Sequence, residues 1–281
     1  MKRFIDGYFR LMLLMALMFG VSSSVMAQNK TKVVAHRGHW NVEGSYENTI
    51  TALRMAHEAG ADACEFDVNM TTDGVLVVCH GPQVGNIQNI QQASYSEVMA
   101  VTLPNGEKIP TLEQFLKAGK KGYKVKQSDG STKLVKLPLV LEIKTPALIE
   151  HEAEIVSKVA YMLKKMKMLE QVSIISFSYG VCKEAVKQIP GITVQYLTGD
   201  KTPYELKNDG IKGMDYHHSL TLVNAEWIDQ AHELGLVVNV WTVDDPEKIQ
   251  TFAQLGVDYI TTNKPELAKK IIEQVEAAKQ K

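Results

Sequence analysis

Apolar residues occur along this chain in short, nearly continuous runs and in longer runs with helical spacing. The short runs are rich in Val, Ile and Leu, as in residues 138–143. Continuous rather than alternating apolarity indicates strands that are buried on both faces, which is typical of a parallel sheet. The strands expected on this basis span residues 32–35, 61–68, 138–143, 172–176, 192–197, 213–216, 237–242 and 259–261.

The longer runs place apolar residues three and four apart, which predicts amphipathic helices between the strands. These helices are expected at residues 48–59, 111–118, 146–169, 179–188, 203–208, 224–234, 246–254 and 264–278. Eight strand–helix units predict an α/β fold, a single-domain (β/α)8 TIM barrel. An open, doubly wound sheet is the alternative, but the first strand is not followed by the Gly-rich sequence of a dinucleotide site.

Two segments interrupt the alternation of strands and helices. Residues 81–105 are polar and rich in Gln and Asn, and we expect them to lie over the mouth of the barrel. At about residues 120–136, strand-like flanks surround Asp129 and Gly130, a pair that favours a tight hairpin turn. We therefore expect a small inserted hairpin and no second domain.

The amino-terminal segment differs from the rest of the chain. Positively charged residues flank an apolar run over 11–21, and the small-x-small pattern VMA ends at residue 27. The run is too short for a comfortable membrane span, so we predict a cleaved signal peptide at residues 1–27 and a barrel domain at 28–281. The protein would be exported, periplasmic or secreted, with no stable membrane insertion after cleavage. An uncleaved amino-terminal anchor is the alternative.

Composition narrows the functional classes. The 281 residues carry a net charge of −1 and no long block of like charge, so nothing favours a nucleic-acid partner or a polybasic membrane contact. Cys64, Cys79 and Cys182 lie in apolar contexts without paired spacing. We expect them to be small buried side chains rather than disulfides or zinc ligands.

Chemically reactive residues gather where the predicted strands end, which is the catalytic face of a (β/α)8 barrel. Glu65 and Asp67 are two residues apart on one strand, so both side chains emerge on the same face. The first three barrel strands and the hairpin that follows the second supply His36, Arg37, Glu65, Asp67, His80, Glu142 and Lys144. This set contains carboxylates, cations and two histidines.

The three carboxylates predict a metal site. Glu65, Asp67 and Glu142 would be costly to bury together without a cation. Carboxylate oxygens are hard ligands, which favours one divalent cation, Ca²⁺ or Mg²⁺. Zinc is less favoured, because the two histidines are needed for proton transfer.

Charge indicates the class of substrate. With a divalent ion, the three carboxylates together with Arg37 and Lys144 have a net charge of +1, the complement of a phosphodiester. Without the ion the net charge is −1, and the anion would be repelled. One of the pair His36 and His80 would take a proton from an attacking hydroxyl, and the other would give a proton to the leaving alkoxide.

These motifs, in this order, resemble the glycerophosphodiester phosphodiesterase family. The matching residues are His36-Arg37-Gly38, Glu47-Asn48-Thr49, Glu65-Phe66-Asp67, Thr72-Asp73-Gly74, His80, Glu142-Ile143-Lys144 and Val240-Trp241-Thr242-Val243, and they extend over nearly the whole mature chain. The resemblance implies a TIM barrel with a divalent cation on the three carboxylates. It also implies hydrolysis of a small glycerophosphodiester to glycerol 3-phosphate and an alcohol.

The resemblance further implies a role for each residue. The glycerol 2-hydroxyl would attack phosphorus first, and water would open the resulting cyclic phosphate. His36 and His80 would be the acid and base, in either order. Arg37 and Lys144 would bind phosphate, and Trp241 would pack against the glycerol.

Three positions depart from the family pattern. Gly81 stands where Asp is usual, Tyr46 where Pro is usual, and Asn263 where Asp is common. None of these changes removes a predicted ligand or histidine, so we expect activity with a shifted substrate range. Two alternatives stay open: a related phospholipase C or D type lyase that acts on intact lipid, and a barrel that binds diesters without turnover.

Other polar residues near the strand ends are weaker candidates. His39 is expected either to touch substrate or to lie on an exposed loop, and His217 and His218 are candidates for the pocket by position alone. Ser176 and Ser178 have no His/Asp partner that would make either a nucleophile, so we expect them to line the pocket or cap a helix.

Overall fold

The structure is a computed structural model that describes residues 30–126 and 129–279. The predicted signal peptide, residues 1–27, lies outside the described residues and stays a prediction. Among the described helices, none combines the length and the apolarity that a membrane crossing requires.

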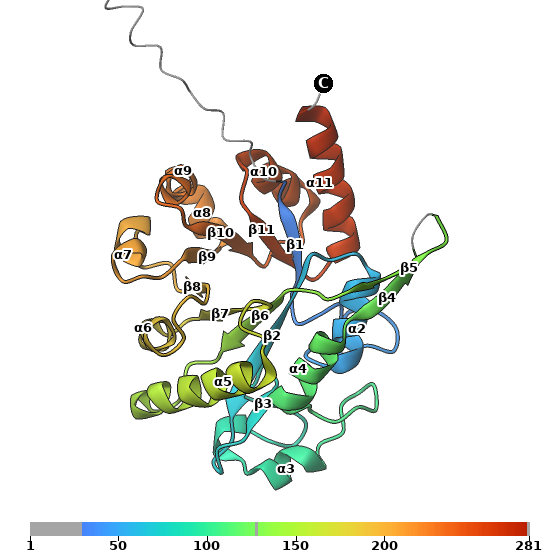
Figure 1. Cartoon of the computed structure of the whole chain (residues 1–281), viewed down its shortest axis with the longest axis vertical. Coiled ribbons are helices and arrows are strands. Elements are labelled where there is room, and N and C mark those ends of the chain that lie inside the picture. The colour runs from blue at the N-terminus through green and yellow to red at the C-terminus, as the bar shows by residue number, and fades with distance from the viewer. Residues whose placement is uncertain (1–29, 127–128, 280–281) are drawn as a thin grey trace, which may run out of the picture.

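Eight parallel strands form a closed barrel (Figure 1). They are β1 (Lys32–Ala35), β2 (Ala63–Met70), β6 (Leu139–Ile143), β7 (Val172–Ser176), β8 (Val194–Tyr196), β9 (Gly213–His217), β10 (Val237–Trp241) and β11 (Tyr259–Thr262). Each strand pairs with the next in this order, and β11 pairs with β1 to close the sheet. The predicted TIM barrel is confirmed.

Helices surround the barrel on the outside (Figure 1). They are α2 (Ile50–Glu58), α4 (Leu112–Lys121), α5 (Glu152–Met166), α6 (Tyr179–Gln188), α7 (Pro203–Asn208), α8 (His218–Val223), α9 (Glu226–Glu233), α10 (Pro246–Leu255) and α11 (Pro265–Lys279). Several begin at a capping side chain: Thr49, Ser178 and Asp245 each accept a backbone N–H of the first turn. The helix expected at 146–169 starts later, after a loop and the short turn η2 (Ile149–His151).

The apolar runs are buried on both faces of the strands, as the sequence pattern predicts. On β6, Leu139, Leu141 and Ile143 join the large core shared with the helices. The alternate residue Val140 belongs to a smaller apolar cluster that also contains Val34 of β1. The strand positions that carry the site therefore rest on a packed core.

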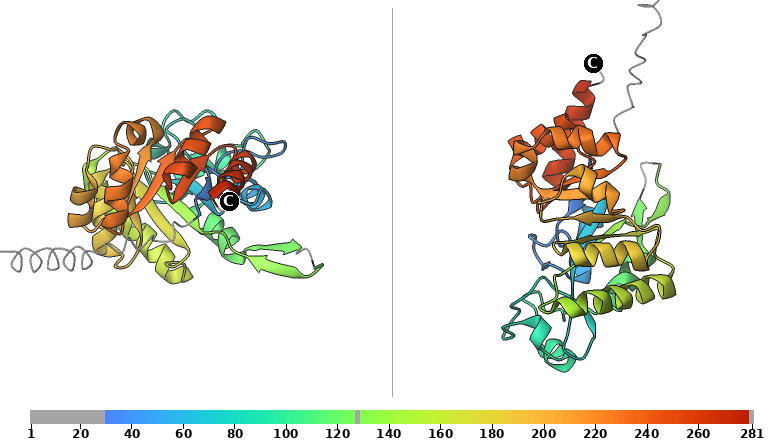
Figure 2. Two further views of the ribbon diagram at one scale, coloured as in Figure 1. Left: turned by 90° about the horizontal axis from the view of Figure 1, so that it is seen from above. Right: turned by 90° about the vertical axis from the view of Figure 1, so that its left-hand side faces the viewer.

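The inserted hairpin is confirmed. Strands β4 (Tyr123–Lys126) and β5 (Thr132–Val135) pair with each other in a separate two-stranded sheet. The turn uses Gly130 at φ 83°, a backbone conformation that favours glycine. Figure 2 shows the hairpin projecting away from the barrel.

Residues 81–105 form a lobe at the carboxyl end of β2, where Gln91 donates to Asn69 and to the carbonyl of Thr145, and their expected position over the mouth stays a prediction. Strand β3 (Leu76–Val78) pairs antiparallel with β2, and the chain continues through η1 (Ile90–Gln92) and α3 (Tyr95–Ala100). Their apolar side chains form a cluster of their own: Val77, Cys79, Val84, Ile90, Ala93, Val98, Val101, Leu103 and Ile109. These scattered apolar residues hold the segment in a side lobe, at the bottom of Figure 1.

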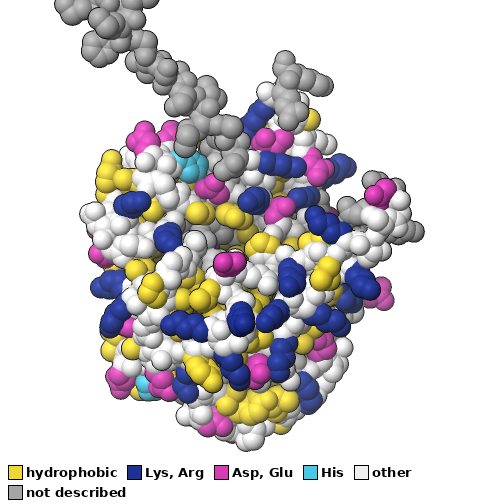
Figure 3. Space-filling model, in the orientation of Figure 1, with side chains coloured by type: hydrophobic (Ala, Val, Ile, Leu, Met, Phe, Trp, Pro, Cys, Tyr) yellow, Lys and Arg dark blue, Asp and Glu magenta, His cyan; other side chains and the backbone are white. Residues whose placement is uncertain are grey.

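The surface and the cysteines agree with the composition. Cys64, Cys79 and Cys182 are buried and free. On the face shown in Figure 3, basic and acidic side chains are interspersed.

Candidate active site

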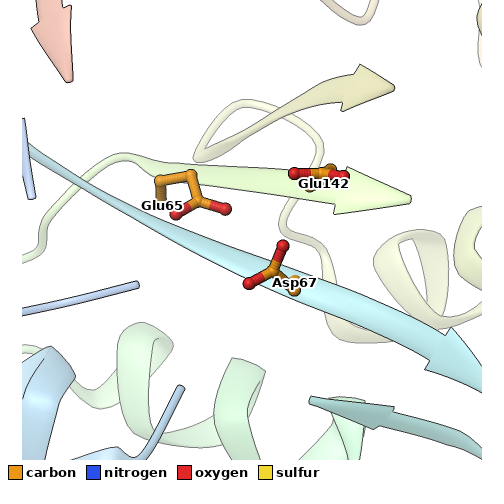
Figure 4. Close-up of side chains that lie close together, drawn as sticks. All are labelled: Glu65, Asp67 and Glu142. Carbon is orange, nitrogen blue, oxygen red and sulfur yellow. The ribbon is translucent and has the colours of Figure 1, made fainter. Parts of the chain in front are cut away.

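The three predicted metal ligands lie together at the carboxyl ends of two neighbouring strands. Glu65 and Asp67 come from β2 and Glu142 from β6, as Figure 4 shows. The parallel register of these strands pairs Asp67 with Glu142. Ligand oxygens of the three side chains lie within 4.8 Å of one another, and all three residues are buried.

Two residues in left-handed backbone conformations hold this group in place. Arg37 (φ 56°) donates its backbone N–H to Glu65 Oε2 at 2.7 Å. Asn48 (φ 62°) donates its side-chain amide to Asp67 Oδ2 at 2.8 Å and accepts the backbone N–H of Asp67 at 2.9 Å. A backbone hydrogen bond from Asn48 to Arg37 joins the two loops. Strained conformations of this kind are concentrated at functional sites, where they hold side chains in position.

Two cationic side chains border the carboxylates. Lys144 Nζ lies 2.7 Å from Glu142 Oε1 and 3.4 Å from Asp67 Oδ1. Arg37 Nε lies 3.6 Å from Asp67 Oδ2, and its Nη1 pairs with Glu47 at 2.6 Å. Burial alone would raise the pKa of Asp67, but Lys144, His80 and Arg37 outweigh it and lower that pKa below its ordinary value.

The pKa values of the two glutamates indicate that the nearby cations do not fully offset the negative charge of the three carboxylates. Burial, followed by repulsion from Asp67 and Glu142, raises the pKa of Glu65 well above its ordinary value. Burial and Asp67 also raise the pKa of Glu142 to about 7. Glu65 Oε1 is buried without a hydrogen-bond partner among the described residues. Hard oxygen donors in this state fit a divalent cation such as Ca²⁺ or Mg²⁺.

Both predicted histidines face the same small cavity, whose volume is about 130 Å³. His36 follows β1 and places Nδ1 2.9 Å from Asn263 Oδ1. His80 follows β3, where Asn69 donates to its backbone carbonyl at 3.4 Å. Burial is the largest cause that lowers the pKa of each imidazole below its ordinary value. Each ring therefore favours the neutral form near pH 7.

The cavity brings together seven of the eight residues that the sequence nominated, and the eighth, Asp67, borders it through Lys144. Its complete lining is His36, Arg37, Glu65, His80, Glu142, Lys144, Ile175, Phe177, Leu197, Asp215, Trp241, Thr242 and Thr261.

An apolar wall faces the charged groups. The Trp241 ring packs edge-on against Phe177 at a centroid distance of 5.3 Å, and its Nε1 donates to the Asp215 carbonyl at 2.8 Å. Lys144 Nζ lies 5.9 Å from the centre of the Phe177 ring. Phe177 was not among the nominated site residues, and its only sequence signal is its place immediately after β7.

Asp215 is a further buried carboxyl group that the sequence did not nominate. It comes from β9, and its Oδ1 has no hydrogen-bond partner among the described residues. Burial, followed by the charge of Glu142, raises the pKa of Asp215 well above its ordinary value. Its signal in the sequence is a single acid inside an apolar strand.

The weaker candidates lie outside the cavity lining. His39 is buried, and its backbone N–H donates to the carbonyl of Ala52, so the alternative of an exposed loop histidine is wrong, while substrate contact stays a prediction. His217 is exposed, and the centre of its ring lies 5.2 Å from the centre of the Trp241 ring. Ser178 caps α6, as expected, and Ser176 donates its hydroxyl to the carbonyl at the end of β6.

The structure shows the contacts made at the three positions that depart from the family pattern. Gly81 has φ 62°, and an added Cβ would lie 3.0 Å from Ile90 Cγ2, so glycine suits this lobe. Tyr46 packs against the apolar cluster of the side lobe. Asn263 is the hydrogen-bond partner of His36.

Comparison with known proteins agrees with this geometry. The model of the Glycerophosphoryl diester phosphodiesterase family matches residues 36–267. A glycerophosphodiester phosphodiesterase of Caldanaerobacter subterraneus subsp. tengcongensis is 29% identical over 251 residues, 84% of this chain and 96% of that protein. One of Bacillus altitudinis is also 29% identical, over 87% of this chain and 99% of that protein.

Solved structures show the same fold. The crystal structure of a glycerophosphodiester phosphodiesterase from Parabacteroides distasonis has a TM-score of 0.81 and 39% identity, covering 88% of this chain and 98% of that one. The residues matched by the family model, 36–267, include every residue of the cavity lining. The chain therefore belongs to the glycerophosphoryl diester phosphodiesterase family.

Proposed function

We propose that this protein hydrolyses glycerophosphodiesters to glycerol 3-phosphate and an alcohol, with a divalent cation held by Glu65, Asp67 and Glu142. The observation that carries this proposal is one cavity lined by two histidines, two cations and two of the three clustered carboxylates, with Asp67 beside it. The histidines can transfer protons, the cations can bind phosphate and the carboxylates can hold a metal ion. None of these features alone indicates phosphodiester hydrolysis, but their combination in one site does. The names of the similar proteins support the same substrate class.

The residues of the chain divide the work as follows in this proposal. Arg37 and Lys144 bind the phosphoryl oxygens and offset their negative charge. The neutral histidine accepts the proton of the attacking hydroxyl, and the other histidine, once it has taken a proton from solvent, gives a proton to the leaving alkoxide. The bound cation would supply further positive charge at the phosphoryl group.

The cavity size favours a small substrate. Its volume of about 130 Å³ is below the roughly 300–1,000 Å³ of pockets that enclose drug-sized ligands. The wall formed by Trp241 and Phe177 gives the carbon side of a glycerol an apolar surface. The alcohol of the diester would extend toward the open mouth.

One observation favours the second candidate, a lyase that acts on lipid with its acyl chains attached. Large apolar side chains are exposed in the segments that follow β6, β7 and β9, namely Leu148, Ile149, Phe177, Leu222 and Val223. These segments begin at the carboxyl ends of the strands, the same end as the cavity. Apolar residues in this position would suit acyl chains more than a choline or ethanolamine group.

Product analysis separates the candidates. The purified chain, supplied with Mg²⁺ or Ca²⁺, is incubated with glycerophosphocholine, lysophosphatidylcholine or phosphatidylcholine, and the products are identified by mass spectrometry. We expect glycerol 3-phosphate and choline from glycerophosphocholine, lost in His36→Ala and retained in the control His151→Ala. Phosphatidic or cyclic products from the lipids alone would support the lyase, and tight binding of the diester without product would support a binding protein.

A further inference from the structure

A hydrogen-bonded chain behind His36 has no part in the function proposed above. The Asn263 amide oxygen lies 2.9 Å from His36 Nδ1 and 3.0 Å from Trp40 Nε1. The Asn263 amide nitrogen donates to Asp244 Oδ2 at 2.7 Å. Asp244 Oδ1 in turn accepts the backbone N–H of Asn263 at 2.7 Å and the hydroxyl of Thr262 at 2.9 Å.

Donor and acceptor chemistry fixes the orientation of the Asn263 amide. The indole Nε1 of Trp40 is only a donor, so the amide atom that faces it is the oxygen. An ionised carboxylate is only an acceptor, so the amide atom that faces Asp244 is the nitrogen. Both neighbours select the same orientation of Asn263. In the reversed orientation, the amide nitrogen would face the Trp40 N–H, and the amide oxygen would face the Asp244 carboxylate.

This orientation decides where the proton of a neutral His36 resides. Because the Asn263 oxygen accepts, His36 Nδ1 must carry the proton, and Nε2 keeps its lone pair. His36 also lines the cavity. We propose that Asp244 and Asn263 are positioning residues that hold His36 as the Nδ1–H tautomer, so that Nε2 is the proton acceptor of the reaction.

The proposal rests on the proposed function for its catalytic part and balances as a proton transfer. His36 Nε2 takes the proton of the attacking hydroxyl while that oxygen bonds to phosphorus. The bond from phosphorus to the alcohol oxygen breaks, and this oxygen takes a proton from protonated His80. Asp244 acts only through Asn263 and touches neither substrate nor the reacting atoms.

The position of the negative charge matters for the pKa of His36. Burial lowers this pKa, as do the charges of Arg37 and His80, while the hydrogen bond that His36 donates to Asn263 and the charge of Asp67 raise it. In this chain a neutral amide contacts the imidazole, and the carboxylate of Asp244 lies one residue further away. An Asp at position 263, as is common in the family, would contact the imidazole directly and raise its pKa.

Exchanging the two side chains tests this chain of contacts. In Asp244→Asn the new amide nitrogen opposes either the side-chain nitrogen or the backbone N–H of Asn263, whichever way the amide is turned, and in Asn263→Asp two carboxylates face each other. We expect each single variant to lose about 100-fold or more in kcat, with less change in KM, as for a misplaced general base. The double variant restores every hydrogen bond and is expected to recover activity to within about tenfold.

The pH profile of the double variant distinguishes a positioning role from a purely structural role, because a purely structural role would leave this profile unchanged. Its carboxylate contacts His36, so the acidic limb of its kcat/KM profile should shift to higher pH by about one unit or more. Asp245→Asn is the matched control, because Asn caps α10 as Asp does and position 245 lies outside the chain of contacts. Single variants with wild-type kcat, or a double variant with an unshifted profile, would overturn the proposal.

A measurement without turnover keeps this proposal separate from the proposed function. Nitrogen-15 NMR of the His36 ring in the folded wild-type protein, with Mg²⁺ or Ca²⁺ added, should show a protonated Nδ1 and an unprotonated Nε2 above its pKa. Asp244→Asn should lose this preference. An Nε2–H tautomer in the wild type would refute the proposal whatever substrate the enzyme uses.

Discussion

Glu65→Gln is expected to abolish activity while leaving the metal-free protein at least as stable as the wild type. Burial, followed by the charges of Asp67 and Glu142, raises the pKa of Glu65 well above its ordinary value, which favours the protonated side chain when no cation is bound. Gln has the shape and charge of the protonated acid, but it cannot supply a negative oxygen to a metal ion. We expect kcat/KM to fall by at least about a thousandfold, because a metal ion stabilises the transition state by several kcal/mol.

Thermal unfolding with and without Ca²⁺ or Mg²⁺ reads out the stability part of this prediction. In the metal-free wild type, the raised pKa of Glu65 gives stability that is present below about pH 4.5 and is lost as pH rises toward the folded-state pKa. Glu65→Gln removes this dependence and the stabilisation by metal. Glu154→Gln, an exposed residue of α5, is the matched control. A full metal-induced shift in Glu65→Gln would contradict the assignment of this ligand.

His80→Ala is expected to lose activity in a way that depends on the leaving group. The alkoxide of choline needs a proton as it departs, whereas p-nitrophenolate does not. If His80 is the acid, its removal should cost about a thousandfold with glycerophosphocholine and only about tenfold with glycerophospho-p-nitrophenol. His36→Ala should lose about a thousandfold with both substrates, because both reactions need the base.

The comparison of kcat/KM for the two substrates checks this division of roles. His151→Ala, outside the cavity lining, should leave both rates unchanged. Equal losses for both substrates in His80→Ala would contradict an acid role for His80. The opposite pattern, with the smaller loss for the p-nitrophenyl substrate in His36→Ala, would exchange the two roles and count against Nε2 of His36 as the proton acceptor.

The spacing of residues within strands was enough to predict most of the site. Glu65 and Asp67 share a face because strand side chains alternate, and Glu142 joins them because parallel strands end at one edge of the barrel. Strand-end position and the family motifs together nominated Trp241, which lines the cavity. Eight repeated units likewise led to the closed barrel.

Contacts that depend on loop conformation were not accessible from the sequence. The clamp of Asn48 on Asp67 requires a left-handed backbone, which the sequence does not predict at this position even though Asn adopts it more readily than most residues. The role of Asp244 depends on its distance to Asn263, which lies 19 residues away in the sequence. The side lobe was missed because its apolar residues are scattered through a polar segment and converge only when the lobe folds.

The central claim is that Glu65, Asp67 and Glu142 hold one divalent cation on which hydrolysis depends. The most direct test removes metal with a chelator, removes the chelator, and measures glycerol 3-phosphate release from glycerophosphocholine as Ca²⁺ or Mg²⁺ is added back. We predict no release without metal and full recovery at one bound ion per chain, counted by calorimetry. Undiminished release from the metal-free protein would contradict the claim.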